Sequence, residues 1–265
     1  MLSPALPIMR RPVNYDEVAA SYDRRYEHTR YPGTEDALRE HVADTPGLDV
    51  LEVGCGTGYW LSLLLDWGAR LTGLDASSGM LERAAQRAPY ATLVRGVAEL
   101  LPFASASFDR LFCVNAYHHF SDKPAFLREA ARVLRPEGRL FTVGMDPRRG
   151  LDRWYIYEYF HGARDLDELR FPATREICAG LERAGFVGCR EFEVERIDVR
   201  KPARSAIAAG LLDRHSTSQL GLLSDEDYEN GVARIHDELA RCEARGETFW
   251  LHADLHLFGT LASLP

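Results

Sequence analysis

The chain has 265 residues and a formal net charge of −8. This length suffices for one α/β domain with additional helices, and the acidic balance disfavours a nucleic-acid partner because nucleic-acid recognition normally requires a basic face. No apolar run is long enough to span a membrane, and the first nine residues lack the basic start and cleavage site of a signal peptide, so we expect no membrane partner.

Hydrophobic periodicity predicts alternating helices and strands, and therefore an α/β fold. The first two predicted helices cover residues 15–26 and 35–42. Strands are predicted over 49–53, 70–74, 92–95, 109–114 and 139–145, with helices between them. A helix over 175–184 ends at a glycine, as helices commonly do, and alternating patterns predict two further strands over 190–199 and 248–258.

The first predicted strand runs directly into a turn whose glycines alternate, Gly54, Gly56 and Gly58. Glycine lets a backbone turn sharply and approach a ligand closely, and the helix start just beyond offers free N–H groups. The pattern Glu-x-Gly-x-Gly-x-Gly differs from the dinucleotide pattern Gly-x-Gly-x-x-Gly. Glu52 would repel a phosphate and suit a cationic amine or sulfonium. Alternatively, Glu52 caps the turn by accepting hydrogen bonds from the loop.

A second acid, Asp75, ends the next predicted strand, 21 residues after Gly54. In nucleotide-binding α/β units an acid at about 20 residues from the glycine turn binds the ribose hydroxyls. The alternative is that Asp75 caps the following helix. Because Ser77 and Ser78 are both available as caps, we favour ribose binding.

These motifs resemble the class I S-adenosylmethionine-dependent methyltransferases that act on small molecules. The similar stretches are residues 50–58, 73–81, 96–103 with 107–109, and 127–140, within a region of resemblance over 14–145. The resemblance implies a Rossmann-like, mostly parallel sheet of seven strands with an antiparallel last strand and a helical lid. It also implies S-adenosyl-L-methionine as the cofactor.

The resemblance implies a cofactor site drawn from the lid helix, the glycine loop, the ribose strand end, the adenine loop and the segment after strand four. The site residues are Tyr15, Tyr22, Arg30, Glu52, Gly54, Cys55, Gly56, Asp75, Ala76, Met80, Val97, Ala98, Glu99 and Asn115. Val97 stands where the family usually carries an aspartate that binds the adenine amino group. We therefore expect adenine to be held by apolar contact with Ala76, Met80 and Val97, and by the backbone N–H of Ala98 or Glu99.

We expect a single domain over 1–265, in which lid segments 1–31, 146–174 and 201–247 cover a core of 32–145, 175–200 and 248–265. Ligands bind beyond the carboxyl ends of parallel strands, and the lid segments start at that rim. Aromatic residues crowd the second segment, namely Trp154, Tyr155, Tyr157, Tyr159 and Phe160. They favour an aromatic or partly apolar small-molecule substrate, although each ring alone is compatible with ordinary packing.

Two adjacent histidines, His118 and His119, follow strand four and are candidate general bases. Alternatively, one packs beneath the cofactor and the other binds a backbone carbonyl. His252 and His256 would share a strand face, but a metal there lacks an identifiable third ligand, so we expect none. Five cysteines without metal-type spacing predict reduced, buried thiols in a cytoplasmic protein: Cys55, Cys113, Cys178, Cys189 and Cys242.

The predicted function is S-adenosylmethionine-dependent O- or N-methylation of a small molecule, which is compatible with secondary metabolism. The alternatives are a methyltransferase acting on protein or nucleic acid, and a protein that binds the cofactor without transferring methyl. The chain carries Asn115-Ala116-Tyr117-His118 after strand four, not the Asn-Pro-Pro-Tyr found in many enzymes that methylate exocyclic amines of bases or glutamine. The sequence leaves the oligomeric state open.

Overall fold

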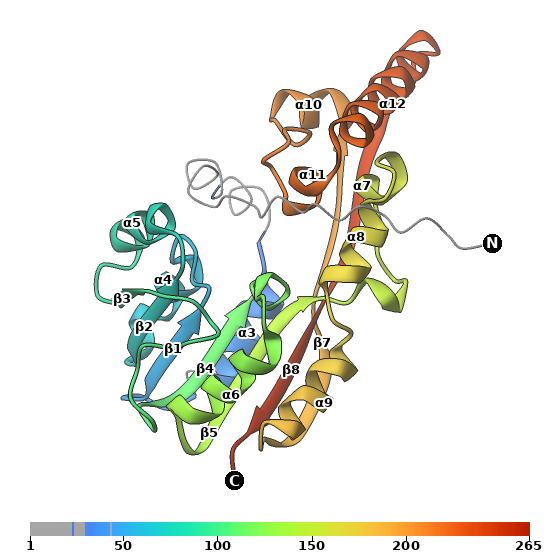
Figure 1. The fold of residues 1–265 in the computed structure, drawn as a ribbon. Coiled ribbons are helices and arrows are strands. Elements are labelled where there is room, and N and C mark those ends of the chain that lie inside the picture. The colour runs from blue at the N-terminus through green and yellow to red at the C-terminus, as the bar shows by residue number, and fades with distance from the viewer. Residues whose placement is uncertain (1–22, 24–29, 43) are drawn as a thin grey trace, which may run out of the picture.

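The computed structural model describes residues 23, 30–42 and 44–265. Their strands form one mixed sheet of eight strands in the order β3-β2-β1-β4-β5-β8-β6, with β7 also paired to β8 (Figure 1). The strands are β1 (Asp49–Val53), β2 (Arg70–Asp75), β3 (Thr92–Arg95), β4 (Phe108–Val114), β5 (Leu134–Met145), β6 (Arg153–Trp154), β7 (Val187–Pro202) and β8 (Trp250–Ser263).

The expected α/β fold, with a mostly parallel sheet and an antiparallel last strand, is confirmed. Strands β1 to β5 pair in parallel, and β8 runs antiparallel to both β5 and β7. The described sheet has eight strands instead of seven because two residues of the predicted lid, Arg153 and Trp154, add β6 to β8. A strand of two residues leaves no periodic signal in the sequence.

Strands β7 and β8 extend well beyond the sheet. Residues 257–263 of β8 pair with β5, whereas residues 250–256 pair only with β7 and β6. The result is a long antiparallel ribbon that rises from the sheet toward the second group of helices (Figure 1). This ribbon connects the part of the sheet next to the glycine loop with the helices of the predicted lid.

Helices fall into two groups. Those that flank the sheet are α3 (Pro32–His41), α4 (Tyr59–Leu64), α5 (Ser78–Arg87), α6 (Lys123–Val133) and α9 (Thr174–Arg183). Those around the ribbon are α7 (Tyr155–Tyr159), α8 (Ala163–Arg170), α10 (Ala203–Ala208), α11 (Ser218–Leu222) and α12 (Asp225–Ala244). Short 3-10 turns are η1 (Leu65–Trp67), η2 (Tyr117–His119) and η3 (Pro147–Arg149).

The helices around the ribbon have a hydrophobic core of their own. Its buried members include Ile156, Phe160, Leu220 and Ile235, drawn from α7, α11 and α12. A Cβ built on Gly231 of α12 would lie 2.2 Å from the Phe160 ring, so α12 packs directly on that ring. For Phe160, ordinary packing is therefore the correct interpretation. Two larger clusters lie against the sheet.

The cysteine prediction is wrong for one pair. Cys178 on α9 and Cys189 on β7 form a disulfide, with Cα atoms 5.6 Å apart. The two residues are separated by the turn that joins the end of α9 to β7, and this antiparallel return brings them together in space. Cys55, Cys113 and Cys242 are free and buried, as expected.

Two other expectations concern helices. The helix predicted over 15–26 lies outside the described residues. Among the helices that the structure describes, none is both long and apolar enough to cross a membrane.

Candidate active site

The glycine loop adopts a conformation that only glycine accommodates readily. Gly54, Gly56 and Gly58 have φ angles of +76°, +52° and +74°, which are in the left-handed region. A Cβ on Gly54 would lie 2.5 Å from the Cβ of Ala116. The loop therefore packs closely against the turn after β4, and α4 begins directly beyond it.

Asp75 holds this loop to the start of α5. Its Oδ2 accepts a hydrogen bond from the Gly56 N–H at 2.8 Å, and its Oδ1 accepts one from the Ser77 N–H at 2.9 Å. The cap of α5 is Ser77, whose Oγ accepts from the Met80 N–H at 3.1 Å. The N-cap of α5 is therefore Ser77 and not Asp75. Its role at the ribose remains a prediction.

Glu52 is fully buried near the end of β1. Within the described residues, neither carboxylate oxygen accepts a hydrogen bond of ordinary length, although the Leu61 N–H in the first turn of α4 lies near enough to act against the rise of the pKa of Glu52. Any capping by Glu52 is therefore limited to a long contact with the start of α4. Burial, and secondarily the nearby Asp75 carboxylate, raise the pKa of Glu52 well above its ordinary value. A buried carboxylate with unused acceptor capacity is costly unless a donor or cation reaches it. This suits a cationic ligand group.

The remaining predicted cofactor residues differ in how far their side chains are buried. Cys55, Met80 and Ala98 are buried, so the Cys55 thiol belongs to the core and only its backbone belongs to the loop surface. Ala76, Val97 and Arg30 are exposed. Tyr15 and Tyr22 lie outside the described residues.

The Glu99 carboxylate is engaged within the protein. It accepts hydrogen bonds from the N–H and hydroxyl of Ser121 at 2.6 and 2.8 Å. Its side chain therefore stabilises the turn before α6, and the adenine contact expected from the backbone N–H of Ala98 or Glu99 stays a prediction.

Sequence reasoning missed Asp23, which binds the outer side of the glycine loop. Its Oδ1 accepts from the Thr57 hydroxyl at 2.5 Å and from Arg87 Nη1 at 2.8 Å, and its other oxygen lies 3.8 Å from Arg83 Nη1. The signal was present, because Asp23 follows Tyr22 in the Tyr-Asp-x-x-Ala-x-x-Tyr-Asp pattern. The contact ties Asp23 to the loop and to α5.

The segment after β4 brings three predicted residues to one place. Asn115 has a left-handed φ of +51° and donates its N–H to the Val143 carbonyl at 2.8 Å. The His118 ring stacks on Phe171, with centroids 3.8 Å apart, and its centroid lies 3.9 Å from that of His119. Asn115, His118 and His119 all line one pocket.

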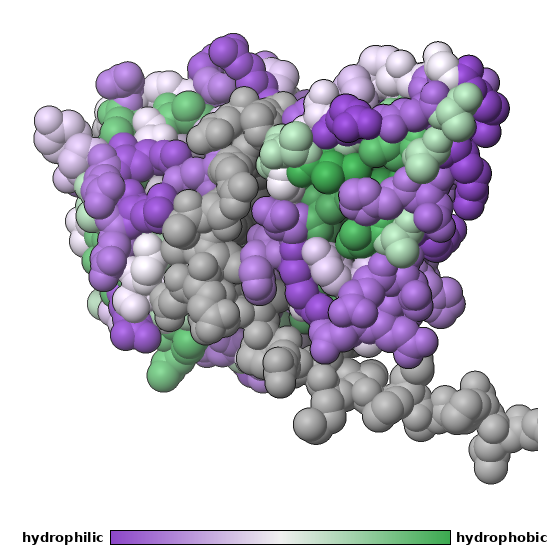
Figure 2. Space-filling model, turned by 90° about the horizontal axis from the view of Figure 1, so that it is seen from above, coloured by the Kyte–Doolittle hydropathy of each residue, from purple (hydrophilic) through white to green (hydrophobic). Residues whose placement is uncertain are grey.

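That pocket has a volume of about 260 Å³ and lies between the ribbon and the helices around it. Figure 2 shows, on the side that carries α10–α12, a hollow in which hydrophobic residues are surrounded by hydrophilic ones. The floor consists of alternate residues of β7 and β8. The walls come from the turn after β4, the start of α7, Phe171 just after α8, the residues that follow α10, and the segment around α11. The apolar floor residues are Ile197, Val199, Leu251, Ala253, Leu255 and Leu257.

Two of the predicted lid aromatics, Trp154 and Tyr155, line this pocket. Tyr157 instead donates its hydroxyl to Asp167 at 2.7 Å, and Tyr159 packs edge-on against Phe249. Of the five lid aromatics singled out in the sequence, two therefore line the pocket. Phe171 adds a third ring from the same segment, and Tyr31 adds one from the end of the segment 1–31.

A buried polar network supports one wall of the pocket. Asp167 is fully buried and accepts hydrogen bonds from Tyr157, from Arg170 Nη2 at 2.7 Å and from Gln219 Nε2 at 2.9 Å. Arg170 also reaches the Ser218 hydroxyl at 3.2 Å. Burial, and then the Asp167 carboxylate, raise the pKa of Tyr157. Asp167 thus fixes α11, and with it Ser218 and Gln219, against α8.

The two strand histidines do not form a pair. In the described part of the chain, His252 groups with Asp198 and Asp254, with ligand-type atoms within 4.8 Å of one another. Arg196 occupies both oxygens of Asp254, at 2.8 and 3.0 Å, so the negative charge is compensated within the protein. His256 lies with its Nδ1 3.1 Å from Glu193 Oε1 and its Nε2 3.7 Å from Asp254 Oδ1.

Comparison with known proteins agrees with this geometry. Residues 51–142 match the methyltransferase domain family. The malonyl-[acyl-carrier protein] O-methyltransferase of Erwinia pyrifoliae is 36% identical over 218 residues, which cover 81% of each chain. The fatty-acid O-methyltransferase of Mycolicibacterium smegmatis is 39% identical over 116 residues, or 42% of each chain.

A solved structure supports the fold. The phosphoethanolamine N-methyltransferase 2 of Haemonchus contortus, in complex with S-adenosyl-L-methionine, has a TM-score of 0.60 and 16% identity, covering 94% of this chain and 57% of that one. With the glycine loop, the sheet order and the sequence relatives, the chain belongs to the class I S-adenosylmethionine-dependent methyltransferases.

Proposed function

We propose that this methyltransferase transfers a methyl group to a carboxylate oxygen of a small molecule with an apolar body. The observation that carries the proposal is the lining of the pocket beside Asn115 and the histidine pair. Its floor is apolar, and none of its described lining residues is an aspartate or glutamate. That lining therefore offers no carboxylate to bind the ammonium form of an amine acceptor.

S-adenosyl-L-methionine fits the residues at the glycine loop. The left-handed glycines have no side chain that would keep a ligand from the backbone, and Asp75, which binds the Gly56 N–H, stands at the strand end where ribose hydroxyls bind in related folds. Glu52 offers the buried, unsatisfied carboxylate that suits a cationic ligand. When bound, the cofactor would supply an activated methyl group on a sulfonium. Its binding here is part of the proposal.

A carboxylate acceptor would also make a general base unnecessary. A carboxylate is ionised at neutral pH and attacks without losing a proton, whereas a hydroxyl acceptor needs a general base. With a carboxylate acceptor, His118 and His119 bind and orient the acid. Orientation alone can lower a barrier by about 7–11 kcal/mol. By their names, the two relatives described above are O-methyltransferases of malonyl-[acyl-carrier protein] and of fatty acids.

One observation favours a second candidate. Both histidines line the pocket, so the alternative is a hydroxyl acceptor with His119 as the general base. The experiment below must distinguish this alternative from a carboxylate acceptor.

The proposal also includes a small-molecule acceptor, free or carried as a thioester, and a cytoplasmic location. We further propose that the segments 146–174 and 201–247 act as the lid over this pocket.

The test is methyl transfer from isotopically labelled S-adenosyl-L-methionine to a panel of acceptors. The panel pairs straight-chain carboxylic acids with the primary alcohols and amines of the same chain length, and includes malonyl-pantetheine. We expect labelled methyl esters from acids only, with a rate that rises with chain length as the apolar floor is covered. Preferred methylation of the alcohols or amines would contradict the proposal. A variant with Asp75→Ala serves as the cofactor-site control.

A further inference from the structure

The pocket contains one permanent cation, Lys201. Among its described lining residues there is no arginine and no other lysine to share an anion with Lys201, and no carboxylate to neutralise it. Within the described chain, Lys201 forms no ion pair, although most of the arginines do. A partly buried ammonium in an apolar setting gains free energy when an anion reaches it.

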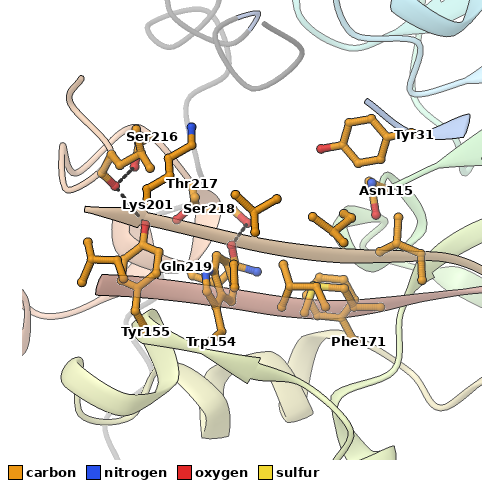
Figure 3. Close-up of a pocket in the computed structure, with 18 of the residues that line it drawn as sticks. Tyr31, Asn115, Trp154, Tyr155, Phe171, Lys201, Ser216, Thr217, Ser218 and Gln219 are labelled. Carbon is orange, nitrogen blue, oxygen red and sulfur yellow. Dashed lines mark hydrogen bonds between the residues drawn. The ribbon is translucent and has the colours of Figure 1, made fainter. Parts of the chain in front are cut away.

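Lys201 lies at one end of the pocket floor. On β7 it follows Ile197 and Val199 at every second residue, so the three share a strand face. The register pairs Lys201 with Leu251, whereas the opposite end of the floor is Leu257, which pairs with Met145 at the end of β5. Figure 3 shows Lys201, Ser216 and Thr217 at one end and Tyr31 and Asn115 at the other.

The length of the floor follows from strand geometry. At about 3.3 Å per residue, Lys201 is roughly 13 Å from Ile197 along β7, and Leu251 is roughly 20 Å from Leu257 along β8. Asn115 and the histidine pair stand at the far end from Lys201, where the methyl group is expected. The apolar residues between them would cover an extended aliphatic body.

A hydroxyl donor accompanies the ammonium. The Thr217 Oγ1 accepts a hydrogen bond from the Leu220 N–H at 3.3 Å, which leaves its own proton available to a ligand. The Ser216 hydroxyl is instead donated to the Leu211 carbonyl at 2.9 Å. One cation and one hydroxyl donor at the same end of an apolar pocket form a site for an oxyanion.

We propose that Lys201, assisted by Thr217, binds a second anionic group at the distal end of the acceptor. The acceptor would then carry a methyl-accepting carboxylate at one end, an apolar middle, and a carboxylate or phosphate ester at the other. This inference rests on the proposed function, since it assumes that the pocket binds the acceptor. It narrows the acceptor class from simple fatty acids to elongated molecules with an anion at each end.

The experiment measures binding without chemistry, by calorimetry in the presence of S-adenosylhomocysteine. One arm compares long-chain α,ω-dicarboxylic acids with monocarboxylic acids of equal chain length. The other compares malonyl-phosphopantetheine with malonyl-pantetheine, which lacks the phosphate. Each ligand is titrated into the full-length wild type, Lys201→Met, Lys201→Arg and, as a matched control, Arg200→Met. Arg200 is the exposed neighbour whose side chain points to the opposite face of β7.

We expect the wild type to prefer the doubly anionic member in at least one arm, which also identifies the anion as carboxylate or phosphate. Lys201→Met should weaken binding of that member roughly 10- to 100-fold, the effect of one lost hydrogen bond to a charged group, and should lose the preference. Lys201→Arg should keep most of it, and Arg200→Met should match the wild type.

Equal affinity for both members in both arms would overturn the inference, as would an equal loss for both members in Lys201→Met. Failure of the proposed function gives a different result, because then no acid of either kind binds or is methylated. If both Lys201 variants fold poorly, the inference is tested on the wild type alone. The wild type should still prefer the doubly anionic ligand, and added salt should weaken that preference.

Discussion

The substitution Gly54→Ala tests how the glycine loop is built. Gly54 has a φ of +76°, and the added Cβ would lie 2.5 Å from the Ala116 Cβ. Nonbonded carbons pack at about 3.5–4.0 Å, so the loop or the turn at Ala116 must move by roughly 1 Å. Because Ala116 follows Asn115, this movement displaces the boundary between the cofactor loop and the acceptor pocket.

Two free-energy costs determine how far Gly54→Ala should destabilise the protein. Placing alanine in the left-handed region costs about 1–2 kcal/mol, and overpacking a close contact costs about 1–3 kcal/mol. We therefore expect Gly54→Ala to lower the free energy of unfolding by about 2–5 kcal/mol, and to weaken S-adenosylhomocysteine binding at least tenfold. Urea unfolding and titration calorimetry measure the two effects.

A double-mutant cycle separates the two terms. Removing the opposing methyl in Gly54→Ala/Ala116→Gly should restore the overpacking part, about 1–3 kcal/mol, while the backbone strain remains. The control is Gly144→Ala, since a Cβ there meets no atom within 4 Å. The reasoning is refuted if Gly54→Ala binds S-adenosylhomocysteine like the wild type, or if the cycle shows no coupling.

Four further substitutions test the site. Asp75→Ala should weaken cofactor binding at least tenfold by calorimetry, because it removes a carboxylate that also orders the loop; unchanged affinity would remove the ribose assignment. The raised pKa of Glu52 in the free protein means that a cationic ligand must drive off a proton, so wild-type cofactor affinity should rise as pH rises through that pKa. Glu52→Gln should flatten this dependence, and a pH profile shared by both proteins would contradict it. His119→Ala should slow methylation of a carboxylic acid less than tenfold without altering its pH profile, whereas a loss of about 100-fold or more would indicate a general base and a hydroxyl acceptor. Asp167→Asn should raise the acceptor KM while cofactor affinity stays near wild type, and the reverse pattern would exclude a role for the network in the pocket wall.

The cofactor half of the molecule was predictable because its signals are local. The alternating glycines and the acid 21 residues later lie within one βα unit, and their conformation depends on neighbours close in sequence. The prediction that one of two serines, Ser77 or Ser78, caps α5 followed from capping preferences alone, and in the structure the cap is Ser77. The mostly parallel sheet and its antiparallel last strand were predicted from the resemblance.

The acceptor half was less predictable because it is assembled from distant segments. Lys201 stands next to Arg200 in the sequence, and nothing local shows that only one of the two faces a pocket. The overhang of β7 and β8 beyond β5 decides this, and it depends on register. The Asp167 network likewise joins residues 52 positions apart, and the Cys178–Cys189 pair depends on how β7 returns along α9.

The most direct test of the whole account is a crystal structure of the protein with S-adenosylhomocysteine and a long-chain dicarboxylic acid. We predict ribose hydroxyls hydrogen-bonded to the Asp75 carboxylate, and an acid lying along β7 and β8 with one carboxylate near His119. A nucleoside bound away from Gly56 and Asp75, or an acid bound outside the pocket, would contradict the account.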